Sequence, residues 1–177
     1  PVVGGTVIRA FHPDATAAAL VAPNGGTQPM DPVGQGVWAA LVADLATELP
    51  EPSADGLTWT FTIKEGVKFA PPVNRAVTSK DIAYAFRRLA TPSVAAQYAN
   101  YYQVIKGLPE FTAGKAKTIS GIQTPDDQTI VFTLTQPTGD FLYRLAMPAA
   151  APIPREVAKC YTQAAEYGRY VISSGPY

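Results

Sequence analysis

The sequence predicts a mixed α/β fold that contains an α+β segment, and three stretches of the chain support this prediction. Apolar and polar residues alternate strictly over residues 57–64, which is the pattern of a half-buried antiparallel strand. Residues 78–89 then carry apolar side chains at helical spacing, which predicts an amphipathic helix. Two further strand-type segments, 117–123 and 129–135, flank a Pro-Asp-Asp turn and predict a second hairpin.

The beginning of the chain contains one clear strand signal and a long turn-rich region. Residues 7–11 form a short apolar run of the type and length of a strand. Residues 12–36 are rich in proline and glycine, which predicts turns, with one helical turn accommodated at 17–22. The apolar residues 37–43 are compatible with a helix. This region is therefore expected to contribute one strand and one helical segment.

The alternating segment places four apolar side chains on one face, and we expect that face to belong to the core. These side chains are Leu57, Trp59, Phe61 and Ile63. The turn sequence Glu65-Gly66 follows the strand and would allow residues 67–69 to return as its hairpin partner. Trp59 is assigned by this spacing to packing and not to a ligand-binding surface.

The helical segment has recognisable signals at both ends. Thr78 is a suitable N-cap residue, and Asp81 stands three residues later, which approximates a capping box. Pro92 ends the helical pattern. Phe86 lies on the apolar face of this helix, so we expect it in the core beside the alternating strand.

The second half of the chain predicts several short helices. Residues 93–105 are expected to form a second helix, and residues 108–112 a single helical turn. A short helix is expected at 141–145 and a longer one over 155–166. Cys160 falls within the last of these, where we expect it to act as a small buried hydrophobe.

Composition indicates a globular protein and argues against several classes of partner. Of the 177 residues, 47% are hydrophobic and 16% are charged. Lys plus Arg and Asp plus Glu are 14 each, so no net positive charge attracts a phosphate backbone, and nucleic acid is not expected as a partner. No apolar run approaches the roughly 18 residues that a bilayer span needs. The first residues also lack the pattern of a signal peptide, which predicts a mature or trimmed start.

Catalytic and metal-binding motifs are weak throughout the sequence. Residues 34–39 match G-x-G-x-x-A, but prolines occupy the place where a dinucleotide-binding fold needs a strand. His12 is the single histidine, and no G-x-S-x-G motif accompanies it. One cysteine excludes an internal disulfide and any cysteine-based zinc site. We therefore expect no enzyme activity, no catalytic or metal-binding residues and no cofactor, while a hydrolase using His12 stays open as an alternative.

Four ordered segments resemble one known protein family. They read D-G-L-T-W-T-F-T-I-K-E-G-V-K-F and V-T-S-K-D-I-A-Y-A-F-R-R-L in the middle, D-L-A-T-E-L-P upstream and S-G-P-Y at the end. Together they resemble the family 5 extracellular solute-binding proteins, the peptide and nickel receptors of ABC importers. The resemblance implies a type II periplasmic binding protein-like fold, represented by part of the N-terminal lobe and an inserted subdomain. Residues 1–45 would start the main lobe, 46–169 would form the inserted α+β subdomain, and 170–177 would return to the main lobe, with the remainder of the protein absent.

The same resemblance implies a function. The protein would be the substrate-binding component of an ABC importer, which captures peptides or a related small polar solute and delivers it to the permease subunits. It would be monomeric and extracellular or periplasmic, with a lipid anchor on the outer face of the cytoplasmic membrane. Two other readings stay open: a solute-sensing domain coupled to a regulator, and a structural or adhesive surface domain.

Binding residues also follow from the resemblance. The stretch Tyr98-Ala-Asn-Tyr-Tyr-Gln103 resembles the "YASYLQ" segment of oligopeptide receptors, which implies that Tyr98 contacts the ligand. The segment after an "LDP"-like sequence reaches the ligand in relatives, which points to Gln35, Gly36 and Trp38. His12, at the end of the first strand, is a further candidate. Packing on an amphipathic helix is the competing explanation for Tyr98.

Overall fold

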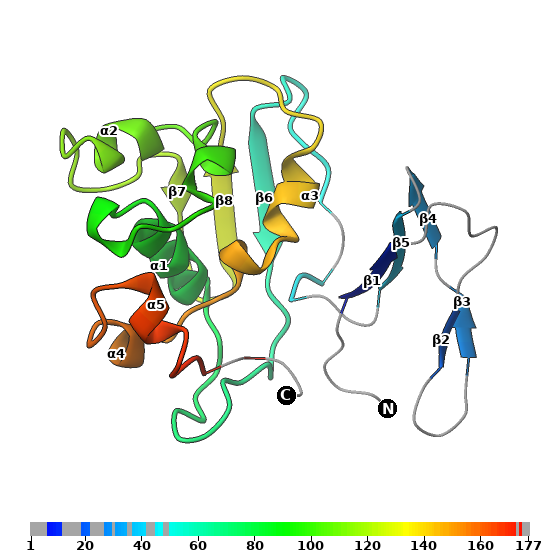
Figure 1. The fold of residues 1–177 in the computed structure, drawn as a ribbon. Helices are drawn as coiled ribbons and strands as arrows, with labels where there is room; N and C mark the ends of the chain where they lie inside the picture. Colours follow the sequence, from blue (N-terminus) through cyan, green and yellow to red (C-terminus); the bar gives the residue numbers. More distant parts are fainter. Residues whose placement is uncertain are drawn as a thin grey trace. The chain divides into compact units, whose positions relative to one another are not determined.

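The computed structural model describes residues 7–11, 19–21, 27–29, 31–34, 37–41, 45–47, 50–172 and 174. The chain divides into two units, Pro1–Leu45 with Gly175–Tyr177, and Ala46–Ser174 (Figure 1). Each unit has its own sheet, so we treat them one after the other.

The described part of the first unit is made of short antiparallel strands. Strands β1 (Val7–Phe11), β5 (Val37–Leu41) and β4 (Asp31–Gly34) form one sheet in that order. Strands β2 (Ala19–Val21) and β3 (Thr27–Pro29) pair separately. The predicted strand at 7–11 is confirmed.

Two helical expectations in this unit are wrong. The apolar stretch expected to be helical at 37–43 is strand β5 over its described residues 37–41, and the helical turn expected at 17–22 includes strand β2. A short apolar run has no periodicity that separates a helix from a buried strand. Residues 37–41 form a strand because β5 pairs antiparallel with both β1 and β4. A local sequence pattern does not show such pairing partners.

The second unit is built on a three-stranded antiparallel sheet in the order β6-β8-β7. Its strands are β6 (Thr58–Thr62), β8 (Thr129–Thr133) and β7 (Ile122–Gln123). Trp59 is opposite Phe132 in the β6–β8 register, so the predicted apolar face of β6 faces the core. The strand and the hairpin predicted here are both confirmed.

The expected hairpin partner of β6 is wrong. Residues 67–69 do not pair with β6 and instead pair with residues 75–77, through hydrogen bonds from Phe69 N–H to Arg75 O (3.0 Å) and from Val77 N–H to Val67 O (2.9 Å). Strand β8, almost 70 residues further along the chain, takes the place beside β6. The turn signal at Glu65-Gly66 therefore opens a separate small loop.

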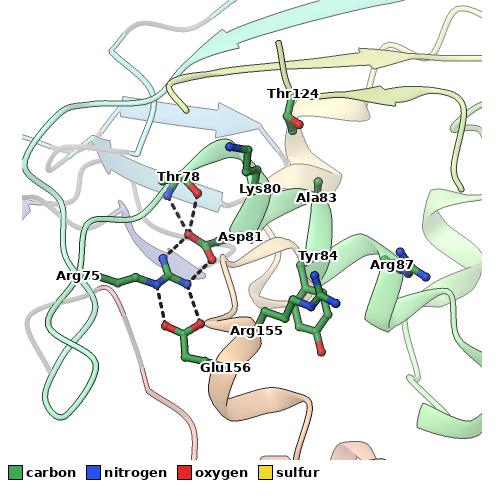
Figure 2. Close-up of a pocket in the computed structure, with 10 residues that line it drawn as sticks. All are labelled: Arg75, Thr78, Lys80, Asp81, Ala83, Tyr84, Arg87, Thr124, Arg155 and Glu156. Atoms are coloured by element: carbon green, nitrogen blue, oxygen red, sulfur yellow. Dashed lines mark hydrogen bonds and ion pairs between the residues drawn. The ribbon is translucent and has the colours of Figure 1, made fainter. Parts of the chain in front are cut away.

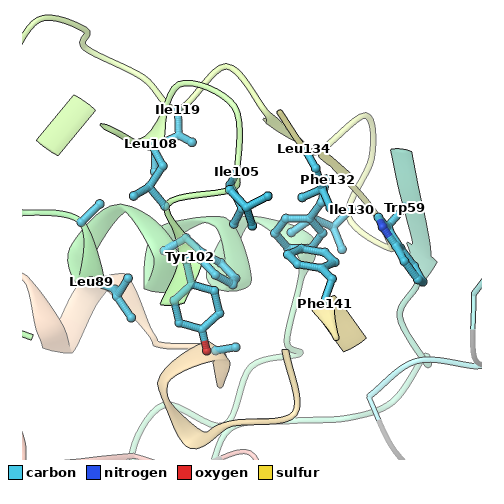
Figure 3. Close-up of a cluster of buried hydrophobic side chains, with 14 residues drawn as sticks. Trp59, Leu89, Tyr102, Ile105, Leu108, Ile119, Ile130, Phe132, Leu134 and Phe141 are labelled. Atoms are coloured by element: carbon cyan, nitrogen blue, oxygen red, sulfur yellow. The ribbon is translucent and has the colours of Figure 1, made fainter. Parts of the chain in front are cut away.

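Helix α1 (Ser79–Leu89) covers the sheet of the second unit, as its periodicity predicted. Thr78 and Asp81 form the predicted capping box. Phe86 is fully buried, with its ring centroid 5.2 Å from that of Phe132 on β8 and 5.1 Å from that of Tyr102. The core extends from Trp59 at one end through this aromatic group to Leu89 and Leu108 at the other (Figure 3).

Short helices complete the unit. They are η1 (Pro92–Val94), η2 (Ala99–Tyr102), α2 (Leu108–Thr112), α3 (Phe141–Leu145), η3 (Pro148–Ala150), α4 (Arg155–Ala158) and α5 (Ala164–Tyr167). The helices expected at 108–112 and 141–145 are confirmed. The continuous helix expected at 93–105 is wrong, because Ala95 adopts a left-handed conformation with φ of 54° that ends η1.

The last helix expected from the sequence, over residues 155–166, is split. It consists of α4 and α5, and Cys160 lies in the turn after α4. Ala158, not Cys160, takes the fully buried position, and Cys160 is exposed, so the expectation of a buried cysteine is wrong. None of the helices in the described part of the chain has the length and apolar character needed to cross a membrane.

Candidate functional site

An ion-pair network at Arg75 joins three segments of the second unit. The Arg75 guanidinium donates to both carboxylate oxygens of Asp81 at the start of α1, with Nη2–Oδ1 2.7 Å and Nη1–Oδ2 2.8 Å. It also donates to both oxygens of Glu156 on α4, with Nε–Oε1 2.6 Å and Nη2–Oε2 2.9 Å. Figure 2 shows one guanidinium lying between two carboxylates. The loop before α1 is thereby held against a helix far along the chain.

The ion pair with Arg75 favours the charged forms of Arg75 and Glu156. The hydrogen bonds that Arg75 donates to Asp81 and to Glu156 raise the pKa of Arg75 further above its usual range. The Arg75 guanidinium lowers the pKa of Glu156 below its ordinary value of 4.5. Asp81, whose side chain is 5% exposed, also accepts hydrogen bonds from the backbone N–H and the hydroxyl of Thr78. The network therefore joins charged partners by paired hydrogen bonds and is suited to holding structure.

A hollow of about 540 Å³ lies beside this network. Its lining residues are Arg75, Thr78, Lys80, Asp81, Ala83, Tyr84, Arg87, Thr124, Arg155 and Glu156. Lys80 is paired with Asp127 across 2.8 Å. Arg155 lies over the ring of Tyr84, 6.0 Å from its centroid, and Arg87 lies over the ring of Phe111 at 5.7 Å. Neither of these two arginines forms an ion pair with any residue that the structure describes.

The side chains of the lining indicate which kind of ligand this hollow could hold. Its lining contains no histidine or cysteine, and its two carboxylates are already bound by Arg75. Within the described ranges there is also no cluster of three or more His, Cys, Asp or Glu side chains that could hold a metal ion. The lining contains cationic and hydroxyl groups, which could bind an anion.

The residues that the sequence singled out fall in different places. Tyr98 precedes helix η2 in the second unit and is 45% exposed. Trp38 lies on β5 of the first unit, opposite Ala10 of β1. Three other predicted ligand residues lie outside the described residues: His12, Gln35 and Gly36. Tyr98 and Trp38 thus belong to different units, and the predicted ligand contacts stay a prediction.

Tyr98 lies next to a second exposed tyrosine. The rings of Tyr98 and Tyr101 are 6.1 Å apart between centroids, and Tyr101 is 52% exposed. Helix η2, which follows Tyr98 and contains Tyr101, is held in place by Tyr102. The hydroxyl of the buried Tyr102 donates to Arg144 O (2.7 Å). Burial raises the pKa of Tyr102 to about 12. Arg144 Nη1 donates back to Tyr101 O (2.7 Å). Packing therefore accounts for Tyr102, and the exposed pair is available for contact.

Sequence reasoning missed the two arginines that organise these regions. Arg75 has its partners 6 and 81 residues away, and Arg144 contacts residues 42 and 43 positions earlier. Among the partners of these two arginines, only Asp81 belonged to a motif visible in the sequence, the capping box of α1.

Comparison with known proteins identifies the family. The family model for bacterial extracellular solute-binding proteins, family 5 Middle, matches residues 40–177. The chain belongs to this family. Family 5 consists of binding proteins and not of enzymes, and its members are extracellular or periplasmic. The resemblance seen in the four sequence segments is confirmed.

Two curated family 5 relatives are similar over most of this chain. The periplasmic oligopeptide-binding protein OppA of Salmonella typhimurium is 30% identical over 126 residues, which is 70% of this chain. A dipeptide-binding protein of Lactococcus lactis is 30% identical over 129 residues, or 71% of this chain. The chain spans 23% of the length of each of these relatives.

Solved structures of family 5 proteins share the fold. The structure described as Listeria monocytogenes OppA bound to peptide matches with a TM-score of 0.65 and 25% identity, over 90% of this chain and 29% of that one. The structural relatives are type II periplasmic binding proteins, so the predicted fold class is confirmed.

Proposed function

We propose that this chain is part of the substrate-binding component of an ABC importer, which captures a peptide or a related small polar solute outside the membrane and delivers it to a permease. The observation that carries the proposal is the family 5 match over residues 40–177. It is supported by relatives that are named as oligopeptide- and dipeptide-binding proteins. We take the activity to be binding without catalysis, because the family consists of binding proteins.

The ligand contacts that we propose begin with Tyr98. An exposed aromatic ring supplies apolar contact area and a polar hydroxyl at low entropic cost, which suits a ligand that combines side chains with a polar backbone. Its neighbour Tyr101 enlarges this surface. We propose Trp38 of β5 and the residues His12, Gln35 and Gly36 as further contacts, on the strength of the sequence resemblance alone.

The proposed mechanism is closure of two lobes around the solute, with contacts that exist only in the closed state. In this scheme residues 1–45 and 170–177 belong to the main lobe and residues 46–169 form the inserted subdomain. We further propose that the protein is monomeric and that a lipid anchor holds it to the outer face of the cytoplasmic membrane. Direct transfer to the permease subunits would complete the transport step.

Ligand-dependent thermal stability of the protein that contains this chain tests the proposal. Dipeptides and oligopeptides of mixed sequence should raise the melting temperature in a saturable way, because binding to the folded state stabilises it by mass action. Tyr98→Ala should weaken peptide binding about tenfold. The matched control is Tyr170→Ala, which removes another exposed tyrosine, one that stacks on Tyr161. Saturable binding of another solute class with no response to any peptide would contradict the proposed ligand.

A further inference from the structure

Arg88 is a buried cation without a charged partner in the described part of the chain. It lies in the last turn of α1 and is 8% exposed. Its Nη1 donates to Ala158 O (3.0 Å), its Nη2 donates to Gln163 O (3.2 Å), and the guanidinium lies 5.0 Å from the ring centroid of Tyr167. All three partners are neutral. A buried charge is costly unless an opposite charge compensates it, so this position favours an anion.

Arg88 lines a second hollow, of about 340 Å³, next to the one beside Arg75. The other lining residues are Tyr84, Arg87, Thr91, Ser93, Val94, Arg155, Lys159, Tyr161 and Thr162. Four of the lining side chains are cations, namely Arg87, Arg88, Arg155 and Lys159, and none of the lining residues is Asp or Glu. The hollow is thus strongly positive, although the whole chain carries no net charge.

The neighbouring hollow differs in its lining, which includes two carboxylates as well as cations. The carboxylates of Asp81 and Glu156 are both bound there by the single guanidinium of Arg75. The two hollows share the wall formed by Tyr84, Arg87 and Arg155, which Figure 2 shows lying along α1 and α4. Like charges gathered around a small volume repel one another, and an anion in that volume would convert the repulsion into attraction.

We propose that this hollow is a binding site for a small oxyanion, either phosphate or the carboxylate groups of a small molecule. Guanidinium groups present paired N–H donors that match the oxygens of both groups. Hydroxyls of Ser93, Thr162 and Tyr161 line the same volume and can donate to further oxygens. The hollow has the size of a small-molecule site and lies within the second unit, so the assignment is independent of the proposed peptide site.

Isothermal titration of the protein that contains this chain tests the assignment, with inorganic phosphate and citrate as probes at constant ionic strength. Saturable binding of at least one probe is expected. Arg155→Gln and Arg87→Gln should each weaken that binding at least about tenfold, because each removes a charged donor from the site. Arg169→Gln is the matched control: this exposed arginine lies outside both hollows and should leave the affinity unchanged.

Circular dichroism and the peptide response of each variant establish that it is folded. If Arg155→Gln does not fold, Lys159→Gln replaces it, since Lys159 is exposed in the turn after α4. Binding that does not saturate, or that is equally strong in the hollow variants and in Arg169→Gln, would overturn the proposal. So would binding of an acidic peptide by the wild type when neither phosphate nor citrate binds, because the site would then serve a protein partner.

Discussion

Arg75 and Glu156 are 81 residues apart in the chain and form an ion pair with two hydrogen bonds, with Nε 2.6 Å from Oε1 and Nη2 2.9 Å from Oε2. The same guanidinium binds the buried carboxylate of Asp81. This arrangement connects the loop before α1, the first turn of α1 and the beginning of α4. The stability of the second unit should therefore respond more to Arg75 than to Glu156, the acid partner that is exposed.

Replacement of Arg75 by methionine is expected to lower the free energy of unfolding of the second unit by about 2 kcal/mol, because it leaves the Asp81 carboxylate buried without a cation. The loss stays at the low end for a buried pair because the Arg75 side chain is 38% exposed. Denaturant unfolding measures it. Lys80→Met is the control, since it breaks an ion pair that is exposed on both sides. Equal effects of the two substitutions would contradict the structural role of Arg75.

The contribution of Glu156 to the stability of the second unit should be lost at low pH. Arg75 lowers the pKa of Glu156 in the folded state below 4.5, so the stabilisation is present above pH 4.5 and is lost as the pH falls through the lower folded value. The melting temperature of Glu156→Gln should be below that of the wild type at neutral pH. The two should converge as the pH drops below 4.5. A difference that is constant from neutral pH to below this range would argue against the ion pair.

Truncation of the central aromatic group should be strongly destabilising. Phe86→Ala removes a fully buried ring that contacts both Phe132 and Tyr102, and the resulting cavity should cost about 3–5 kcal/mol. Tyr143→Ala is the comparison, because Tyr143 is 53% exposed and its loss should change the free energy of unfolding by less than about 0.5 kcal/mol. Chemical denaturation followed by circular dichroism distinguishes the two.

Gly121 is needed where three backbone segments meet. A Cβ at this position would lie 2.5 Å from Thr133 O and 2.6 Å from Lys106 O, and backbone atoms cannot yield as a side chain can. Gly121→Ala should therefore destabilise the fold by about 2 kcal/mol or more. Gly139→Ala should be close to neutral, since no heavy atom lies within 4 Å of its added Cβ. Similar melting temperatures for the two variants would show that the segments around Gly121 can separate.

The elements predicted well are those whose signal is local. Strand β6 and helix α1 were predicted because alternation and helical periodicity are written in consecutive residues, and the capping box joins residues only three positions apart. The β7–β8 hairpin belongs to the same class, since one turn connects its strands. Burial of Trp59 and Phe86 followed from those patterns.

The predictions are wrong where the structure depends on contacts between distant segments or on the backbone angles of a single residue. The partner of β6 is β8 and not residues 67–69, which pair with residues 75–77. The helix expected at 93–105 stops at Ala95, whose left-handed conformation is not signalled by alanine. Cys160 is exposed because α4 ends at Ala158, so the position of a helix end changed the environment of a side chain.

By itself the sequence determined the family, the mixed α/β class and the core face of the central strand, because motifs and periodicity are properties of neighbouring residues. Only the tertiary structure placed Arg75 between Asp81 and Glu156 and gathered Arg87, Arg88, Arg155 and Lys159 around one hollow. Arg75 and Glu156, for example, are 81 residues apart in the chain, and electrostatic energy depends on distance in space and on burial. Neither quantity can be read from the order of residues in a single chain.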